Sequence, residues 1–173
     1  MSSTSTSTTT HTRTQTAVFL TDVVMGTIAD ILADLRIDVT ALYRDWKQDE
    51  AAIAAWIGEA SLEQVVLECH QPSGTVSPIL EFPVAYRGGG AADAKFTADR
   101  AALARYRAKL DRVPPGTSFR LLCTYRKTPS PQPGWEAASR AATSGLRSLR
   151  FGTLASAPDA TVSLRYLRSE RSI

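Results

Sequence analysis

Hydrophobic positions recur at helical spacing in the segment that begins near Leu20. Apolar side chains lie three or four positions apart from Leu20 to Leu35, and Asp30 and Asp34 fall on the opposite side. This pattern is typical of an amphipathic helix that buries one face, and Thr21 is placed to cap its N-terminus. We therefore predict a first long helix that starts at Thr21.

Three further segments have helical character. Thr40–Lys47 has the length of a short helical turn, and Asp49–Ile57 is rich in alanine and carries Trp56 on its apolar side. We expect Trp56 to be buried, because large aromatic side chains at such positions fill the core. A second long helix is predicted over about Ala94–Leu110.

Three segments alternate between apolar and polar residues with the period of a strand. Leu62–His70 and Val76–Arg87 flank the turn residues Gln71–Gly74 and predict a β-hairpin. Ser118–Lys127 predicts a third strand. Pro83 cannot donate to a strand ladder, so the second strand is expected to have a free side.

The two ends of the chain differ from this regular middle. Residues 1–11 are Ser/Thr-rich and predict a flexible tail, and the threonine alternation of Thr10–Thr16 suits a strand. Residues 128–173 are rich in Pro, Gly, Ser, Ala and Arg until Thr161–Arg168 alternates again. A compact domain carries such a long irregular segment when that segment moves or binds. Residues 12–127 are then the core of a single domain.

The composition is that of a globular protein. The chain has 173 residues, of which 43% are hydrophobic and 21% charged, and it has no apolar run of the ~20 residues that a membrane span needs. The N-terminus lacks the apolar segment of a secretory signal. The two cysteines, Cys69 and Cys123, lie in predicted strands as buried thiols and form no disulfide framework. These features predict a cytoplasmic protein.

Charge is divided unequally along the chain. Residues 1–99 carry 6 basic and 13 acidic side chains, whereas residues 100–173 carry 14 basic and 4 acidic ones. Such a division can indicate a nucleic-acid surface, a surface for an acidic protein partner, or two halves that attract each other. Arginines beside aromatic residues, as at Tyr106 and Phe151, keep a nucleic-acid-binding accessory protein as the alternative function.

Catalytic and metal-binding patterns are missing from the sequence. The two histidines are His11 and His70, and His70 follows Cys69 on a strand, where neighbours point to opposite faces and cannot share a metal ion. No Gly-x-Ser-x-Gly elbow and no phosphate-binding glycine loop occurs. We predict no metal site, no cofactor and no enzymatic activity.

The order of the predicted elements resembles that of the HORMA domain. Four segments, two central and two in the tail, are similar to the second type of bacterial HORMA protein, found beside antiphage systems that signal with cyclic oligonucleotides: Ala52–Gly58, Leu62–Glu68, Pro133–Trp135 and Gly145–Leu146. The likeness also includes the first helix, Asp22–Leu35, and Arg44-Asp45-Trp46. It implies an α+β fold with a three-stranded antiparallel core sheet backed by helices, and a C-terminal "safety belt" over residues 128–173.

The resemblance also implies a mechanism. A closure-motif peptide adds as a strand to the edge of Ser118–Lys127, and the belt wraps around it. The peptide-bound form activates a cyclic-oligonucleotide synthase, and a AAA+ ATPase resets the domain. The chain's own N-terminal tail, Met1–Thr10 with its extension to Thr16, is a further candidate occupant. An adaptor with a fixed tail remains the structural alternative.

The peptide site is expected to combine one face of the edge strand with bulky residues of the belt. The strand and belt residues that we predict at this site are Arg120, Leu122, Thr124, Arg126, Trp135, Leu149 and Phe151.

Overall fold

The computed structural model describes residues 3–87 and 95–169, apart from the side chains of residues 3–11. In chain order, the elements are α1 (Ser3–Asp34), α2 (Thr40–Arg44), α3 (Trp46–Gly58), β1 (Leu62–His70), β2 (Val76–Tyr86), β3 (Thr97–Ala98), α4 (Arg100–Arg107), β4 (Ser118–Tyr125), β5 (Leu146–Ser156) and β6 (Ala160–Ser169). The α+β class, the hairpin β1–β2 and the strand β4 agree with the sequence predictions.

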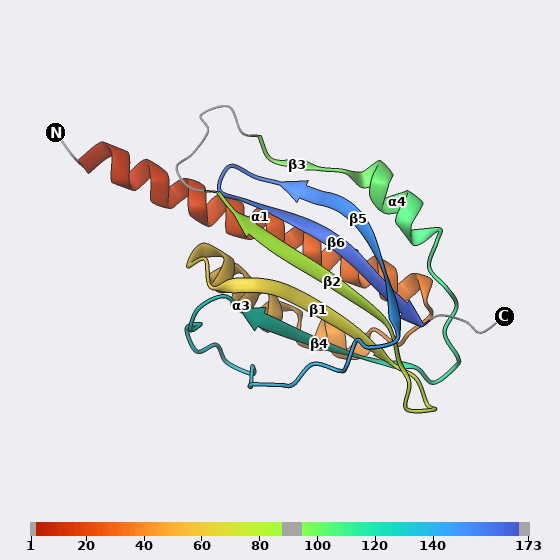
Figure 1. Ribbon diagram of the computed structural model, residues 1–173. Helices are drawn as coiled ribbons and strands as arrows, with labels where there is room; N and C mark the ends of the chain where they lie inside the picture. Colours follow the sequence, from red (N-terminus) through yellow and green to blue (C-terminus); the bar gives the residue numbers. More distant parts are fainter. Residues whose placement is uncertain (1–2, 88–94, 170–173) are drawn as a thin grey trace.

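The strands form one antiparallel sheet with the order β3-β5-β6-β2-β1-β4. Helices α1 and α3 lie against one face of this sheet (Figure 1). The main core fills the space between these helices and the sheet, and it includes Leu20, Ile28, Trp56 and Phe82. The sheet has six strands rather than the three of the predicted core, because residues of the predicted belt supply β5 and β6, and Thr97–Ala98 supply β3.

Helix α1 contains the predicted first helix but begins far upstream of it. Thr21 does not cap the helix, because its Oγ1 donates to the Ala17 carbonyl within it at 2.6 Å. The predicted strand over Thr10–Thr16 is wrong: these residues are helical. Burial of Thr16 and Ala17 against the core outweighs the low helix propensity of threonine. Because Thr10–Thr16 is helical, its backbone N–H and C=O groups form hydrogen bonds within the helix and cannot pair with a sheet edge.

Part of α1 also meets the length and composition of a membrane span. Thr12–Asp34 is long and apolar enough to cross a bilayer, which the sequence analysis did not expect. In this fold its apolar residues Val24, Met25 and Leu32 are fully buried among the other core residues. The core helix of a folded domain satisfies the same criterion, so length alone does not assign the helix to a membrane.

Strand β2 is a central strand, so the expectation of a free side is wrong for the strand as a whole. It pairs with β1 on one side and with β6 on the other. The β2–β6 register passes from Glu81 opposite Arg165 to Val84 opposite Val162, and it skips Pro83. The missing N–H of Pro83 therefore costs no hydrogen bond of the ladder.

Helix α4 is shorter than the helix predicted over Ala94–Leu110, whose first residue lies outside the described residues. Thr97 and Ala98 instead form β3, which pairs with β5. The Asp99 carboxylate then accepts a hydrogen bond from the Ala102 N–H at 2.8 Å and caps α4. This pairing of β3 with a distant strand is a tertiary contact, which local helical periodicity does not reveal.

Candidate functional site

Strand β4 forms one edge of the sheet. It pairs with β1 from His70 opposite Ser118 to Leu62 opposite Tyr125, and among the described residues no strand pairs with its outer side. Phe119 and Leu121 face the helices and pack against the main core. Alternate residues such as Leu122 face the opposite side of the sheet. The outer side of β4 can therefore accept an added strand.

The chain after β4 runs along this edge as an irregular segment, which we call the belt loop (residues 126–145) (Figure 1). On the helix side of the sheet, the loop is anchored by Trp56. The Trp56 indole N–H donates to the Ser130 carbonyl at 2.8 Å, and the ring meets that of Trp135 edge to face at 5.2 Å. The Ser130 N–H also donates to the Glu59 carboxylate at 2.9 Å.

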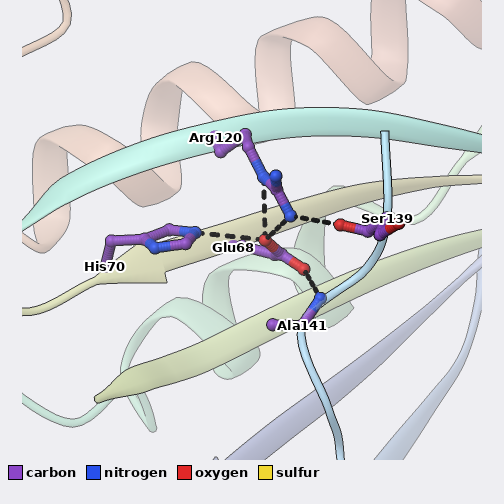
Figure 2. A network of polar contacts seen from close by, with 5 residues as sticks. All are labelled: Glu68, His70, Arg120, Ser139 and Ala141. Carbon is purple, nitrogen blue, oxygen red and sulfur yellow. Dashed lines mark hydrogen bonds and ion pairs between the residues drawn. The ribbon is translucent and has the colours of Figure 1, made fainter. Parts of the chain in front are cut away.

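Farther along, the belt loop reaches the opposite face of the sheet. There the Glu68 carboxylate accepts the Ala141 N–H at 2.7 Å and two N–H groups of Arg120 at 2.7 and 3.0 Å. Arg120 also donates to the Ser139 carbonyl at 2.6 Å, and His70 lies 3.1 Å from the same carboxylate (Figure 2). Glu68 is fully buried, so this network joins the loop to the middle of the sheet.

The electrostatic environment keeps Glu68 ionised. Burial by itself raises the pKa of this carboxyl group, but the Ala141 N–H, Arg120 and His70 together lower the pKa below its ordinary value. The neighbouring strand repeats the arrangement, because the Glu81 carboxylate lies 2.7 Å from both Arg140 and Arg165. Those two contacts are ion pairs rather than well-aligned hydrogen bonds.

These contacts account for part of the unequal distribution of charge along the sequence. Glu68 and Glu81 belong to the acidic half, whereas their partners Arg120, Arg140 and Arg165 belong to the basic half. Of the three interpretations of the charge division, the described ion pairs support two halves that attract each other. These arginines are committed to buried glutamates, which disfavours a nucleic-acid surface built from them.

The belt loop therefore passes around β4, from Trp56 on the helix face to Glu68 on the other. Between the loop, α2, α3 and β4 lies a cavity of about 290 Å³. Leu42, Phe119 and Leu121 form its apolar walls. A segment that pairs with β4 would lie inside the loop, and half of its side chains would point toward this cavity.

The lining of the cavity also carries acidic side chains. Asp45 and Asp49 from the helices and Glu136 from the loop line it, together with Trp135. Burial and the nearby Asp45 raise the pKa of Asp49 to about 6, although the indole N–H of Trp135 partly opposes this. That N–H makes no hydrogen bond of normal geometry with any described residue.

The structure places the predicted residues of β4 in different roles. Arg120 belongs to the network of Glu68, and Leu122 is buried in a small cluster on the same face. The Thr124 hydroxyl donates to the exposed Glu63 at 2.8 Å. Arg126, just beyond β4, lies 5.1 Å above the Tyr86 ring. All four therefore contact the protein itself in this conformation.

The predicted belt residues are divided between two places. Trp135 lies beside β4 and lines the cavity. Leu149 and Phe151 lie on β5, which β6, β2 and β1 separate from β4, so the structure does not bring them to the edge strand. Phe151 instead stacks on Tyr106 at 4.1 Å. Side-chain size alone therefore does not predict which belt residues lie beside β4.

The residues that hold the loop were not predicted as part of the site. Trp56 was predicted as core, which its burial confirms, but not as the anchor of Ser130. Glu68 and Arg140 were not assigned to the site either. A glutamate at a buried strand position is the sequence feature that could have indicated these contacts, because a buried carboxylate requires partners.

A helix-backed antiparallel sheet whose edge is wrapped by a C-terminal segment is the architecture of the HORMA domain. The chain belongs to the family described as bacterial HORMA domain 2, whose profile matches residues 4–170. The comparison with curated proteins finds no match.

Solved structures share this fold at low sequence identity. A chain of the mitotic checkpoint complex superposes with a TM-score of 0.72 at 9% identity, covering 90% of this chain and 99% of that one. C. elegans HTP-1 bound to the HIM-3 closure motif gives 0.68 at 12% identity, with 91% of each chain covered. The E. coli MS115-1 CdnC:HORMA-deltaN complex gives 0.60 at 14%, covering 90% and 88%.

Proposed function

We propose that this protein is a peptide-binding switch that holds a closure-motif peptide between strand β4 and the belt loop. The observation that carries the proposal is the path of the loop, which passes from Trp56 on one face of the sheet to Glu68 on the other. An added strand gains main-chain hydrogen bonds from β4, and the loop prevents its escape. The C. elegans relative bound to a closure motif supports this mode of binding.

The proposal includes a signalling partner. The E. coli relative forms a complex with CdnC, and we extend this association to a cyclic-oligonucleotide synthase as the partner of the present chain. The peptide-bound form activates the synthase in antiphage defence, and a AAA+ ATPase resets the domain in the cytoplasm. A bistable belt, biased by the peptide, is the physical basis of such a switch.

Peptide capture is tested by selecting displayed random peptides on the full chain. Amide hydrogen exchange is then measured with a selected peptide and with its scrambled sequence. The selected peptide should slow exchange in β4 and in the belt loop and leave α4 unchanged. If no peptide is selected, or if exchange in the loop does not respond, capture under the belt is wrong and a fixed-tail adaptor is favoured.

Synthase activation is tested separately. The purified synthase is incubated with this protein, with and without the selected peptide, and cyclic-oligonucleotide products are quantified. Product formation should require both the protein and the peptide. Equal product without the peptide would contradict the switch, even if the peptide binds.

A further inference from the structure

The cavity beside β4 has a distinctive combination of surfaces. Its lining is apolar at Phe119 and Leu121 and also carries the carboxylates of Asp45, Asp49 and Glu136. No lysine or arginine is among the described residues that line it. A side chain that enters from β4 therefore meets both hydrophobic surface and negative charge.

Asp49 lacks a positive partner among the described residues. Arg44 pairs with Asp45 at 3.0 Å, but no ion pair with Asp49 occurs among the described residues. Asp49 is also half-buried and raised in pKa, as expected of a carboxylate that has lost water without gaining a cation. The indole N–H of Trp135 offsets only part of this rise in pKa. A ligand with a positive charge would satisfy this site.

The cavity lies on the side of β4 toward which side chains of a paired peptide would point. The cavity touches Phe119 and Leu121, which share the helix-facing side of the strand. Side chains of a strand added to this edge alternate in the same way as those of β4. Every second peptide side chain therefore points to the side on which the cavity lies.

We propose that this cavity is a specificity pocket for one lysine or arginine side chain of the captured peptide. The aliphatic stem packs on Phe119 and Leu121, and the cationic head reaches the carboxylate of Asp49. Long basic side chains bury their stems and keep their charge at a polar end in this way. The inference rests on the proposed peptide capture and adds the chemical class of the residue that the site selects.

The test is a display selection with a fully random peptide library on the full-length protein. Three proteins are compared: the wild type, Asp49→Asn, and the matched control Asp30→Asn, which removes a carboxylate of α1 that lines a different cavity. Wild type and Asp30→Asn should enrich lysine or arginine at one fixed position. Asp49→Asn should lose that enrichment and still select peptides.

A second measurement uses a selected peptide and its copy with norleucine at the basic position. Loss of a charge-assisted contact should weaken binding to wild type by about tenfold, and the two peptides should bind Asp49→Asn within about twofold of each other. Binding of the basic peptide to wild type should also weaken as the pH falls through about 6, the pKa of Asp49. The titratable groups that face Asp49 are Asp45 from the helices, Cys123 from β4 and Glu136 from the loop.

The outcomes separate this inference from the function on which it rests. Selected peptides without a preferred basic residue, or equal discrimination by wild type and Asp49→Asn, would overturn the pocket and leave peptide capture intact. Failure to select any peptide on the wild type would overturn both. Circular dichroism of each variant establishes that it is folded before selection.

Discussion

Replacing Glu68 by glutamine tests the contact that holds the belt loop on the sheet. Glutamine has nearly the same shape but carries no charge, so the ion pair with Arg120 is lost and the acceptor for the Ala141 N–H is weakened. Arg120 also holds the Ser139 carbonyl. The substitution should therefore loosen the loop around Ser139 and Ala141 without changing the packing volume of the sheet.

The magnitude follows from the contacts. Hydrogen bonds to a charged group contribute about 1.5–3 kcal/mol each, and the Ala141 bond to the fully buried Glu68 carboxylate belongs to this class. The Arg120 side chain is 41% exposed, so solvent screening reduces its contribution. We expect Glu68→Gln to lower the free energy of unfolding by about 2–4 kcal/mol, somewhat less than the roughly 3–5 kcal/mol lost when a buried pair is broken.

Urea unfolding measures the stability, and limited proteolysis measures exposure of the belt loop. The matched control is Glu63→Gln on the same strand, since the Glu63 side chain is exposed and accepts from Thr124. This control should change stability by less than about 0.5 kcal/mol. If Glu68→Gln also changes stability by less than about 0.5 kcal/mol and leaves cleavage of the loop unaltered, the interpretation that Glu68 holds the belt loop is refuted.

Acidification provides an independent measurement of the same contact. The pKa of Glu68 is lower in the folded protein than its ordinary value of 4.5. The stabilisation is therefore fully present above about pH 4.5 and is lost as the pH falls through the folded-state pKa. Below pH 4.5, the stability of Glu68→Gln should fall less steeply with pH than that of the wild type. Parallel acid profiles for the two proteins would contradict this assignment.

Three further predictions concern the anchors and the tail. Trp56→Ala should lower the free energy of unfolding by roughly 3–5 kcal/mol, because it empties a large buried site; a loss below about 1 kcal/mol in urea unfolding would contradict its burial. Gly134→Ala should increase proteolysis of the belt loop more than Gly145→Ala does. Both glycines have positive φ, but an added Cβ overlaps the Gln48 side chain only at Gly134. A chain without residues 128–173 should lack cooperative thermal unfolding by circular dichroism, because β2 loses its partner β6.

The sequence predicted best those elements whose periodicity and packing agree. The bounds of β1 match the prediction, and β2 and β4 begin where expected, because each of these strands alternates apolar and polar residues. Helix α3 ends at Gly58, where glycine interrupts the apolar pattern. In these segments local preference and tertiary contact favour the same structure, so pattern alone is sufficient.

The remaining elements depend on contacts that are distant in sequence. Strand β5 mixes its apolar residues with Ser, Arg and Gly152 and has a bulge near Gly152, so it alternates poorly and is recognised only by its pairing with β6. The prediction that the segment 128–173 is weakly structured is therefore wrong for β5. The partners of Glu68 were equally unpredictable, because Arg120 is 52 residues away and Ala141 is 73 residues away.

The two attachments of the belt loop differ in chemistry, and this difference bears on how it opens. At Trp56 the loop is held by aromatic contact and a hydrogen bond to Ser130. At the other end it is held by hydrogen bonds of Ala141 to Glu68 and of Arg120 to Ser139, and by the ion pair of Arg140 with Glu81. The side chains of Arg120 and Arg140 remain 41% and 27% exposed. Water can rehydrate these guanidinium groups as they separate, whereas parting the two indole rings exposes apolar surface. We therefore expect the loop to detach first from the Glu68 face, which uncovers the edge of β4 while Trp56 still holds the loop.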